Sequence, residues 1–249
     1  MNMPKQAVGS PSMVGRLLEE ISWERATNYR EGGRGLENVL SAEVLQALNF
    51  LPRKHFLGAL MQAAHGAEKT RTLLVSEIEE AAMEFLPGDL PLSLGNTTFR
   101  QVHVQPDALL TLPGAYVLVE AKRLRRSAFQ LNQLAREYVA VMAHAQGRLP
   151  LIVLFGVMPP VSIKGLGKMS VKEAVAGELA LALAESGSDP LAAEDLMETI
   201  DEVFCWISWA EIDAVIRKQS ATFAASDASV HGSVQRLAAS ITTAIAWHS

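Results

Sequence analysis

Two apolar runs flank Pro113-Gly114, and this arrangement constrains the fold more than any other feature of the sequence. Proline followed by glycine is a strong turn signal, so residues 99–111 and 116–124 are predicted to form the two strands of a hairpin. The middle of the hairpin is apolar on both faces, with Ala108, Leu110, Val117 and Val119 on one face and Leu109 and Leu118 on the other. Strands that are buried on both sides are typical of a sheet covered by helices. The hairpin therefore predicts an α/β fold.

Helical periodicity surrounds the hairpin, as an α/β sandwich requires. Helices are predicted at residues 13–27, 36–50, 53–65, 68–86, 127–146, 170–185 and 230–248, and directly after Ser208. Further strands are predicted at residues 90–94, 149–158 and 203–208. Three residue pairs have the spacing of a capping box, which marks the start of a helix. These pairs are Ser127/Gln130, Ser170/Glu173 and Ser208/Glu211.

Composition narrows the classes of function. The chain has 249 residues, a formal net charge of -5 and a sequence pI of about 5.7, which argues against a generally basic nucleic-acid coat. Cys205 is the only cysteine, so an intrachain disulfide is impossible and a reducing cytoplasm is the expected compartment. The apolar runs are shorter than the roughly 20 residues that span a bilayer, so no membrane partner is expected.

Two acidic residues face each other across the predicted hairpin. If the turn centres on Pro113-Gly114, Asp107 pairs with Glu120, and paired residues have Cβ atoms roughly 5 Å apart. Like charges so placed are destabilising, and a divalent cation is the simplest compensation because hard cations bind carboxylate oxygens. Strand alternation puts Lys122 on the same face as Glu120. One sheet face is thus predicted to carry two carboxylates and an ammonium.

Basic residues concentrate directly after this face. Lys122 and the three arginines that follow, Arg123, Arg125 and Arg126, are four cations within five residues. Lysine and arginine contacts to phosphate supply most nonspecific affinity for nucleic acid, so these arginines are candidate nucleic-acid contacts; a solvated strand end is the alternative. Residues 164–168 (Lys-Gly-Leu-Gly-Lys) lack the spacing of a P-loop and are interpreted as a loop, with contact to phosphate as the alternative.

The motif Pro106-Asp107, twelve residues, then Glu120-Ala121-Lys122 resembles the active-site motif of the PD-(D/E)XK nuclease superfamily. The resemblance implies a restriction-endonuclease-like α-β-β-β-α-β sandwich with a mixed central sheet and extra helices at both ends. It covers roughly residues 36–158 and extends as far as residue 218. We accordingly divide the chain into an N-terminal helix and flexible basic loop (1–35), a nuclease-like domain (36–218) and a C-terminal linker and helix (219–249).

The resemblance also implies site roles. Asp107 and Glu120 would hold Mg²⁺, with Mn²⁺ as a substitute, and the backbone carbonyl of Ala121 would add a ligand. Lys122 would orient the attacking water and stabilise charge on the phosphate. The implied activity is hydrolysis of phosphodiester bonds, with DNA as the expected partner. A homodimer is a further expectation, since cutting both strands needs two sites.

Two helices are expected to complete this site. In the family a glutamate on the first core helix often adds a ligand, and Glu37 is our choice, with Glu80 as its rival. Some relatives carry a glutamine and a tyrosine four residues apart on the helix after the lysine. Here Gln133 and Tyr138 are five residues apart, so their side chains would point about 140° apart around a helix and would not share one face. Only Gln133 is therefore carried over as catalytic.

Less specific interpretations remain for the same residues. Asp107 is equally compatible with a strand-end residue, and Glu120 and Lys122 with an exposed charge pair. The first alternative function is a nuclease-fold module that has lost catalysis and binds nucleic acid or protein. The second is an unrelated hydrolase with a carboxylate pair, which would have a small-molecule pocket in place of an open basic cleft.

Overall fold

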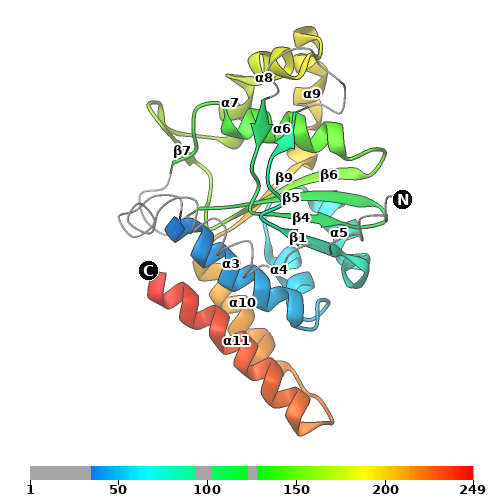
Figure 1. Cartoon of the computed structure of the whole chain (residues 1–249), viewed down its shortest axis with the longest axis vertical. Helices are drawn as coiled ribbons and strands as arrows, with labels where there is room; N and C mark the ends of the chain where they lie inside the picture. The colour runs from blue at the N-terminus through cyan, green and yellow to red at the C-terminus, as the bar shows by residue number, and fades with distance from the viewer. Residues whose placement is uncertain (1–34, 93–101, 123–127, 249) are drawn as a thin grey trace, which may run out of the picture.

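The computed structural model describes residues 35–92, 102–122 and 128–248. Within them, a five-stranded mixed sheet lies between two layers of helices, so the α/β prediction is confirmed (Figure 1). The predicted helix at residues 13–27 lies outside the described residues. No helix in the described ranges is both long and apolar enough to cross a membrane.

The central sheet has the strand order β1-β4-β5-β6-β9. β1 (Ala82–Phe85), β4 (Ala108–Thr111) and β5 (Ala115–Ala121) pair antiparallel, whereas β5, β6 (Leu149–Phe155) and β9 (Phe204–Ile207) pair parallel. Two small antiparallel ribbons accompany it. They are β2 (Leu90–Pro91) with β3 (His103–Val104), and β7 (Val161–Ile163) with β8 (Gly167–Met169).

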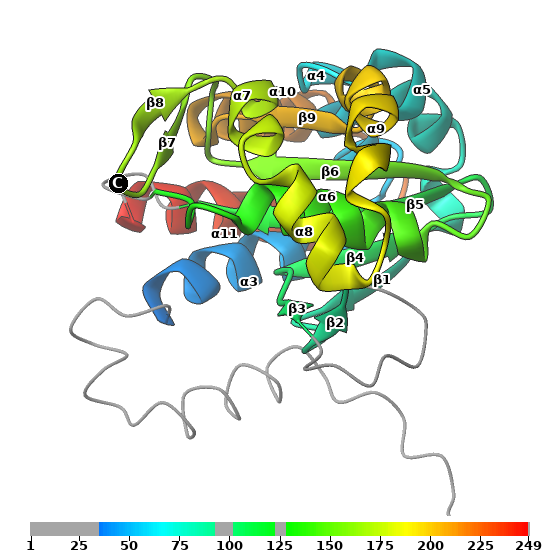
Figure 2. The ribbon, with the colours of Figure 1, turned by 90° about the horizontal axis from the view of Figure 1, so that it is seen from above.

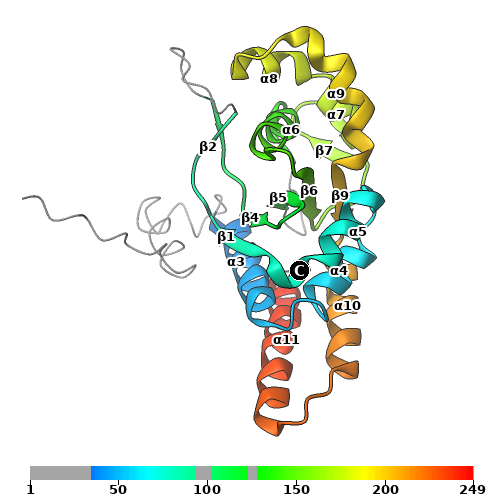
Figure 3. The same cartoon turned by 90° about the vertical axis from the view of Figure 1, so that its right-hand side faces the viewer.

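The helices form one layer on each face of the sheet, as the view along its edge shows (Figure 3). The first layer contains α3 (Gly35–Phe50), α4 (Leu57–Ala63), α5 (Glu68–Ser76), α10 (Trp209–Thr222) and α11 (Ala228–His248). The second contains α6 (Gln133–His144), α7 (Val171–Ala176), α8 (Leu179–Ser186) and α9 (Ala193–Thr199). Short 3₁₀ turns lie at η1 (Ile78–Glu80), η2 (Pro190–Ala192) and η3 (Ile200–Glu202).

Each layer buries one apolar face of the hairpin, as the sequence predicts. Ala108, Leu110, Val117 and Val119 lie in the core beneath α3, α4, α10 and α11, whereas Leu109 and Leu118 lie in the core beneath α6, α7 and α8. The hairpin turn is also where it was expected, because Leu112 N donates to Ala115 O at 2.9 Å across Pro113-Gly114. The hairpin thus lies between the two hydrophobic cores and contributes side chains to both.

The predicted helix at residues 68–86 is wrong in its second half. α5 ends at Ser76, and after η1 the chain enters strand β1, which pairs with β4. Hydrogen bonds to distant segments stabilise the connection from α5 to β1. Glu77 Oε2 accepts from Gly114 N at 2.8 Å, and the guanidinium of Arg53 donates to Ala81 O. Pairing with the exposed edge of β4 therefore overrides a local helical pattern, because tertiary context outweighs propensity.

Three further boundaries need correction. α6 begins at Gln133 with Asn132 as its N-cap, and not near residue 127, because Phe129 forms a β-bridge to Ile163 instead. Residues 162–168, predicted as a loop, form most of the β7–β8 hairpin. The predicted helix at 170–185 divides into α7 and α8 around Gly177. The capping boxes at Ser170 and Ser208 are confirmed.

Candidate functional site

The candidate site lies at the carboxyl end of β5, on the sheet face that α6 covers. Asp107 directly precedes β4, and its N–H donates to Val119 O at 3.0 Å. The paired register of β4 and β5 ends at Ala108 and Val119, and Asp107 and Glu120 are the residues next to this last pair on the two arms of the hairpin. Lys122 follows one residue after β5 ends. All three side chains are buried, with exposures of 8%, 5% and 7% respectively.

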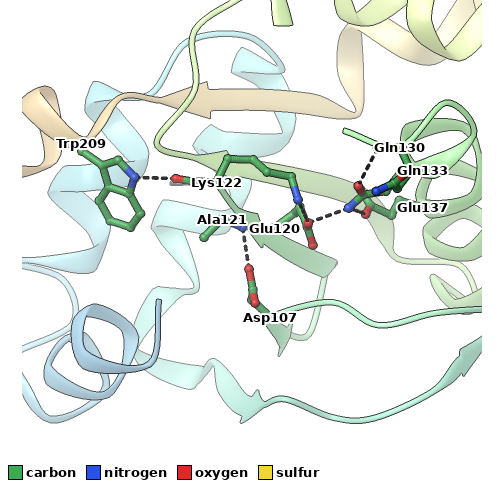
Figure 4. Close-up of polar contacts among 8 residues, drawn as sticks. All are labelled: Asp107, Glu120, Ala121, Lys122, Gln130, Gln133, Glu137 and Trp209. Carbon is green, nitrogen blue, oxygen red and sulfur yellow. Dashed lines mark hydrogen bonds and ion pairs between the residues drawn. The ribbon is translucent and has the colours of Figure 1, made fainter. Parts of the chain in front are cut away.

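Asp107 is held against the backbone of the neighbouring strand. Its Oδ2 accepts a hydrogen bond from Ala121 N at 2.7 Å (Figure 4). A buried carboxylate is stable only when such donors replace the water it has lost. This bond fixes the carboxylate of Asp107 beside the end of β5.

Glu120 receives two donors on a single oxygen. Lys122 Nζ and Gln133 Nε2 each lie 2.6 Å from Glu120 Oε1, and neither reaches Oε2 (Figure 4). The ammonium of Lys122 also lies 4.9 Å from the centre of the Phe129 ring, within the range of a cation–π contact. Glu120, Lys122 and Gln133 are thus brought together, as expected, and Lys122 is fixed by a carboxylate on one side and an aromatic face on the other.

Glu137 joins the site and was missed by the sequence prediction. Gln133 Nε2 also donates to Glu137 Oε1 at 2.7 Å, so one amide bridges two carboxyl groups. Glu137 is 2% exposed, and its Oε2 has no hydrogen-bond partner in the described part of the chain. Burial, and then the nearby charge of Glu120, raise the pKa of Glu137 well above its ordinary value. The available signal was its spacing from Gln133, since residues four apart share a helix face.

The backbone at Lys122 is fixed from the opposite core. Trp209 Nε1 donates to Lys122 O at 2.7 Å (Figure 4). Lys122 N donates to Phe155 O at 2.9 Å. Gly156, at φ +78°, makes room for this contact, because a Cβ at that position would overlap the Trp209 indole and Lys122 O. The first residue of α10 and the end of β6 therefore position the lysine.

Of the remaining predicted site residues, the structure describes the side chain of Glu80 alone. Glu80 is exposed in η1, on the side of the sheet that α3 covers, and makes no hydrogen bond to Asp107, Glu120 or Lys122. Glu37 belongs to α3, but its side chain lies outside what the structure describes. The arginine cluster Arg123, Arg125 and Arg126 also lies outside the described residues. Tyr138 is fully buried and donates to Leu196 O, as expected of a core residue.

The donor set has the chemistry that Mg²⁺ prefers. Magnesium is usually held by one or two carboxylates, with water and phosphate oxygens completing its shell. Asp107 and Glu120 supply two carboxylates, and the Ala121 carbonyl is the third donor that the sequence suggests. Among the described residues, no group of three or more His, Cys, Asp or Glu side chains has an arrangement that could hold a metal ion.

The chain was compared with protein-family models, with curated proteins and with solved structures, and none of the three comparisons gave a match.

Proposed function

We propose that this chain is a metal-dependent nuclease of the PD-(D/E)XK superfamily, hydrolysing phosphodiester bonds in DNA. The observation that carries the proposal is that Asp107, Glu120 and Lys122 are buried at the end of one hairpin, with Lys122 bonded to Glu120 and Asp107 bonded to the backbone N–H between them. The element order supports it, since α3, β1, β4, β5, α6 and β6 follow the helix–three strands–helix–strand order of that superfamily. The antiparallel and then parallel pairing of these strands agrees with its mixed sheet.

The reaction requires an activated water and charge stabilisation at phosphorus. A divalent cation held by Asp107 and Glu120 would supply both, by lowering the pKa of water and by acting as a Lewis acid. Lys122, fixed beside Glu120, would donate to a phosphate oxygen and offset the charge that develops there. The oxygen of water would bond to phosphorus as the bond from phosphorus to the leaving sugar oxygen breaks, and a proton lost by the water would pass through solvent to that leaving oxygen.

Gln133 and Glu137 would orient the site without touching the substrate. The side-chain amide of Gln133 donates to both Glu120 and Glu137. The position of the Glu120 carboxylate therefore depends on Gln133 and, through it, on Glu137. Because two donors occupy Oε1 of Glu120, its Oε2 is the oxygen that would face the cation. Partners of this kind typically change metal affinity or activity 10- to 100-fold when they are removed, as an order of magnitude.

The proposal is tested by incubating plasmid DNA with the protein and Mg²⁺ or Mn²⁺, and measuring loss of the supercoiled form. Wild type is expected to cut, whereas Asp107→Asn and Lys122→Met should each slow cutting by about 100-fold or more, a range typical of lost charge stabilisation. The exposed pair Lys172 and Asp201 provides matched controls, since Lys172→Met and Asp201→Asn change the same residue types far from the site. Equal rates in all five proteins would contradict the proposal.

The alternative is a nuclease-fold module that binds nucleic acid or protein without catalysis. One observation favours it: the described structure already gives Asp107 Oδ2 and Glu120 Oε1 protein donors, so neither oxygen needs a cation for its hydrogen bonding. The module predicts DNA retention in a binding assay with no cutting under any divalent cation.

A further inference from the structure

The β7–β8 hairpin is an exposed element that is joined to the candidate site through Phe129. Val161 and Ile163 bury their side chains in the core beneath α6, whereas every residue from Lys164 to Lys168 is exposed. Figure 2 shows the ribbon standing out beyond one end of the central sheet. Its base is thus fixed in the core while its tip projects into solvent.

Main-chain bonds tie this hairpin to the site. Phe129 N donates to Ser162 O, and Lys164 N donates to Phe129 O, both at 2.9 Å, so Phe129 joins β7 as a short parallel bridge. The ring of Phe129 is the surface on which the Lys122 ammonium rests, 4.9 Å from its centre. One buried side chain therefore separates the lysine of the site from the hairpin.

The tip has the composition of a contact surface for a polyanion. Lys164 and Lys168 flank Leu166, and neither lysine forms an ion pair within the described ranges. Leu166 is 59% exposed at the turn. Gly165 and Gly167 both adopt positive φ, and no atom lies within 4 Å of a Cβ built on either. The turn is therefore shaped by its glycines and presents one aliphatic side chain between two cations.

We propose that this tip, residues 164–168, binds the DNA duplex that the site cuts, with Lys164 and Lys168 contacting phosphates and Leu166 entering a base step. The proposal rests on the nuclease function above. Aliphatic side chains such as leucine are the wedges that proteins insert between stacked base pairs, whereas binding of single strands uses aromatic platforms, which this tip lacks. Duplex DNA is thus the substrate form that its chemistry fits.

The phosphate contacts are tested by fluorescence anisotropy with a labelled duplex in EDTA, where no cutting occurs, over a series of salt concentrations. Each phosphate contact contributes about 0.9 to the magnitude of the negative slope of log K against log salt. The double variant K164A/K168A should therefore reduce the magnitude of the slope by about 1.8. Lys218→Ala is the control, because Lys218 is an exposed lysine of α10 on the opposite face of the sheet.

The wedge is tested with 2-aminopurine in the same duplex, whose fluorescence rises when its neighbours unstack. Wild type should raise the signal, and Leu166→Ser should abolish the rise while leaving the salt slope unchanged. Leu191→Ser is the control, since Leu191 is 85% exposed in η2. Circular dichroism of each variant verifies that it is folded.

These outcomes separate the two proposals. An unchanged slope in K164A/K168A, together with an unchanged 2-aminopurine signal in Leu166→Ser, overturns the hairpin proposal even if wild type cuts DNA. Absence of any duplex binding by wild type overturns it too. If the variants bind as predicted but wild type cuts nothing under any divalent cation, the hairpin proposal stands and the hydrolytic function fails.

Discussion

One amide connects the two acids that matter most to the electrostatics of the site. Gln133 lies between Glu120 and Glu137 with bonds of 2.6 and 2.7 Å, and Lys122 adds a single positive charge on the Glu120 side. The ammonium of Lys122 can balance the negative charge of one carboxylate, but not the charges of Glu120 and Glu137 together. The raised pKa of Glu137 is consistent with this balance, because a neutral carboxyl avoids the cost of a second buried charge.

Stability should therefore depend on pH through Glu137. The unfolded carboxyl loses its proton above about pH 4.5, whereas the raised pKa of the folded carboxyl keeps the proton bound to a higher pH. The folded state therefore binds more protons between these two pKa values and loses stability as pH rises through them. Glu137→Gln mimics the neutral carboxyl at every pH. We expect the melting temperature of this variant, relative to wild type, to increase between pH 4.5 and pH 8 in EDTA.

The control for this comparison is Glu194→Gln, an exposed glutamate of α9. Its difference from wild type should stay constant over the same pH range. Parallel melting profiles for Glu137→Gln and wild type would mean that Glu137 is ionised in the folded protein, and the electrostatic description of the site would be wrong.

At the scale of elements, the end of β6 and the start of α10 determine where Lys122 lies. β6 runs parallel to β5, and Gly156 follows its last residue at the point where the Trp209 indole reaches across to Lys122 O. Only glycine leaves room there. This packing joins the core under α10 to the site on the opposite face of the sheet.

Gly156→Ala should be strongly destabilising. The added methyl would meet both the indole of Trp209 and the carbonyl of Lys122, besides taking a positive φ. We expect a loss of about 3–5 kcal/mol in urea unfolding, the range of severe core overpacking with backbone strain. Gly147→Ala is the matched control, since Gly147 has φ +87° and open space around it, and its loss should be about 1–2 kcal/mol. Equal losses would show that the contact with Trp209 is unimportant.

Across the whole molecule, segments far apart in sequence complete one helical layer. α11 packs beside α3 and α10, and Val234, Ala238 and Ile241 are buried in the same core as Leu45 and Leu48 of α3 (Figure 1). The sheet face beneath this layer includes Val117 and Val119 of the hairpin. The helices at both ends of the described chain therefore help to bury the strands that carry Asp107 and Glu120.

Local patterns were sufficient to predict the centre of this molecule. The Pro-Gly turn and the two-sided apolar strands predict the register of residues 108–111 with residues 116–119, because side-chain alternation follows from strand geometry alone. The capping boxes at Ser170 and Ser208 were likewise readable, since their hydrogen bonds join residues three apart.

Features that depend on distant partners were not predictable in this way. The sequence predicts helix where β1 forms, because the pairing of β1 with β4 and the bond from Arg53 to Ala81 O, just before β1, lie outside any local window. The ribbon of β7 and β8 was interpreted as a loop, since Phe129 stabilises it from a position over thirty residues earlier in the chain. Glu137 was missed because its burial beside the site depends on tertiary packing, although its spacing from Gln133 places both residues on one helix face.

The most direct test of the account is a calorimetric titration with Mn²⁺. Wild type is expected to bind the ion, and Glu120→Gln and Asp107→Asn should each weaken binding by about 10-fold or more, because each removes a charged oxygen ligand. The surface control Asp201→Asn should keep its affinity, since Asp201 is not a ligand and makes no contact with either carboxylate. Absence of binding by wild type, or equal binding by wild type, Glu120→Gln and Asp107→Asn, would contradict the claim that Asp107 and Glu120 share a cation.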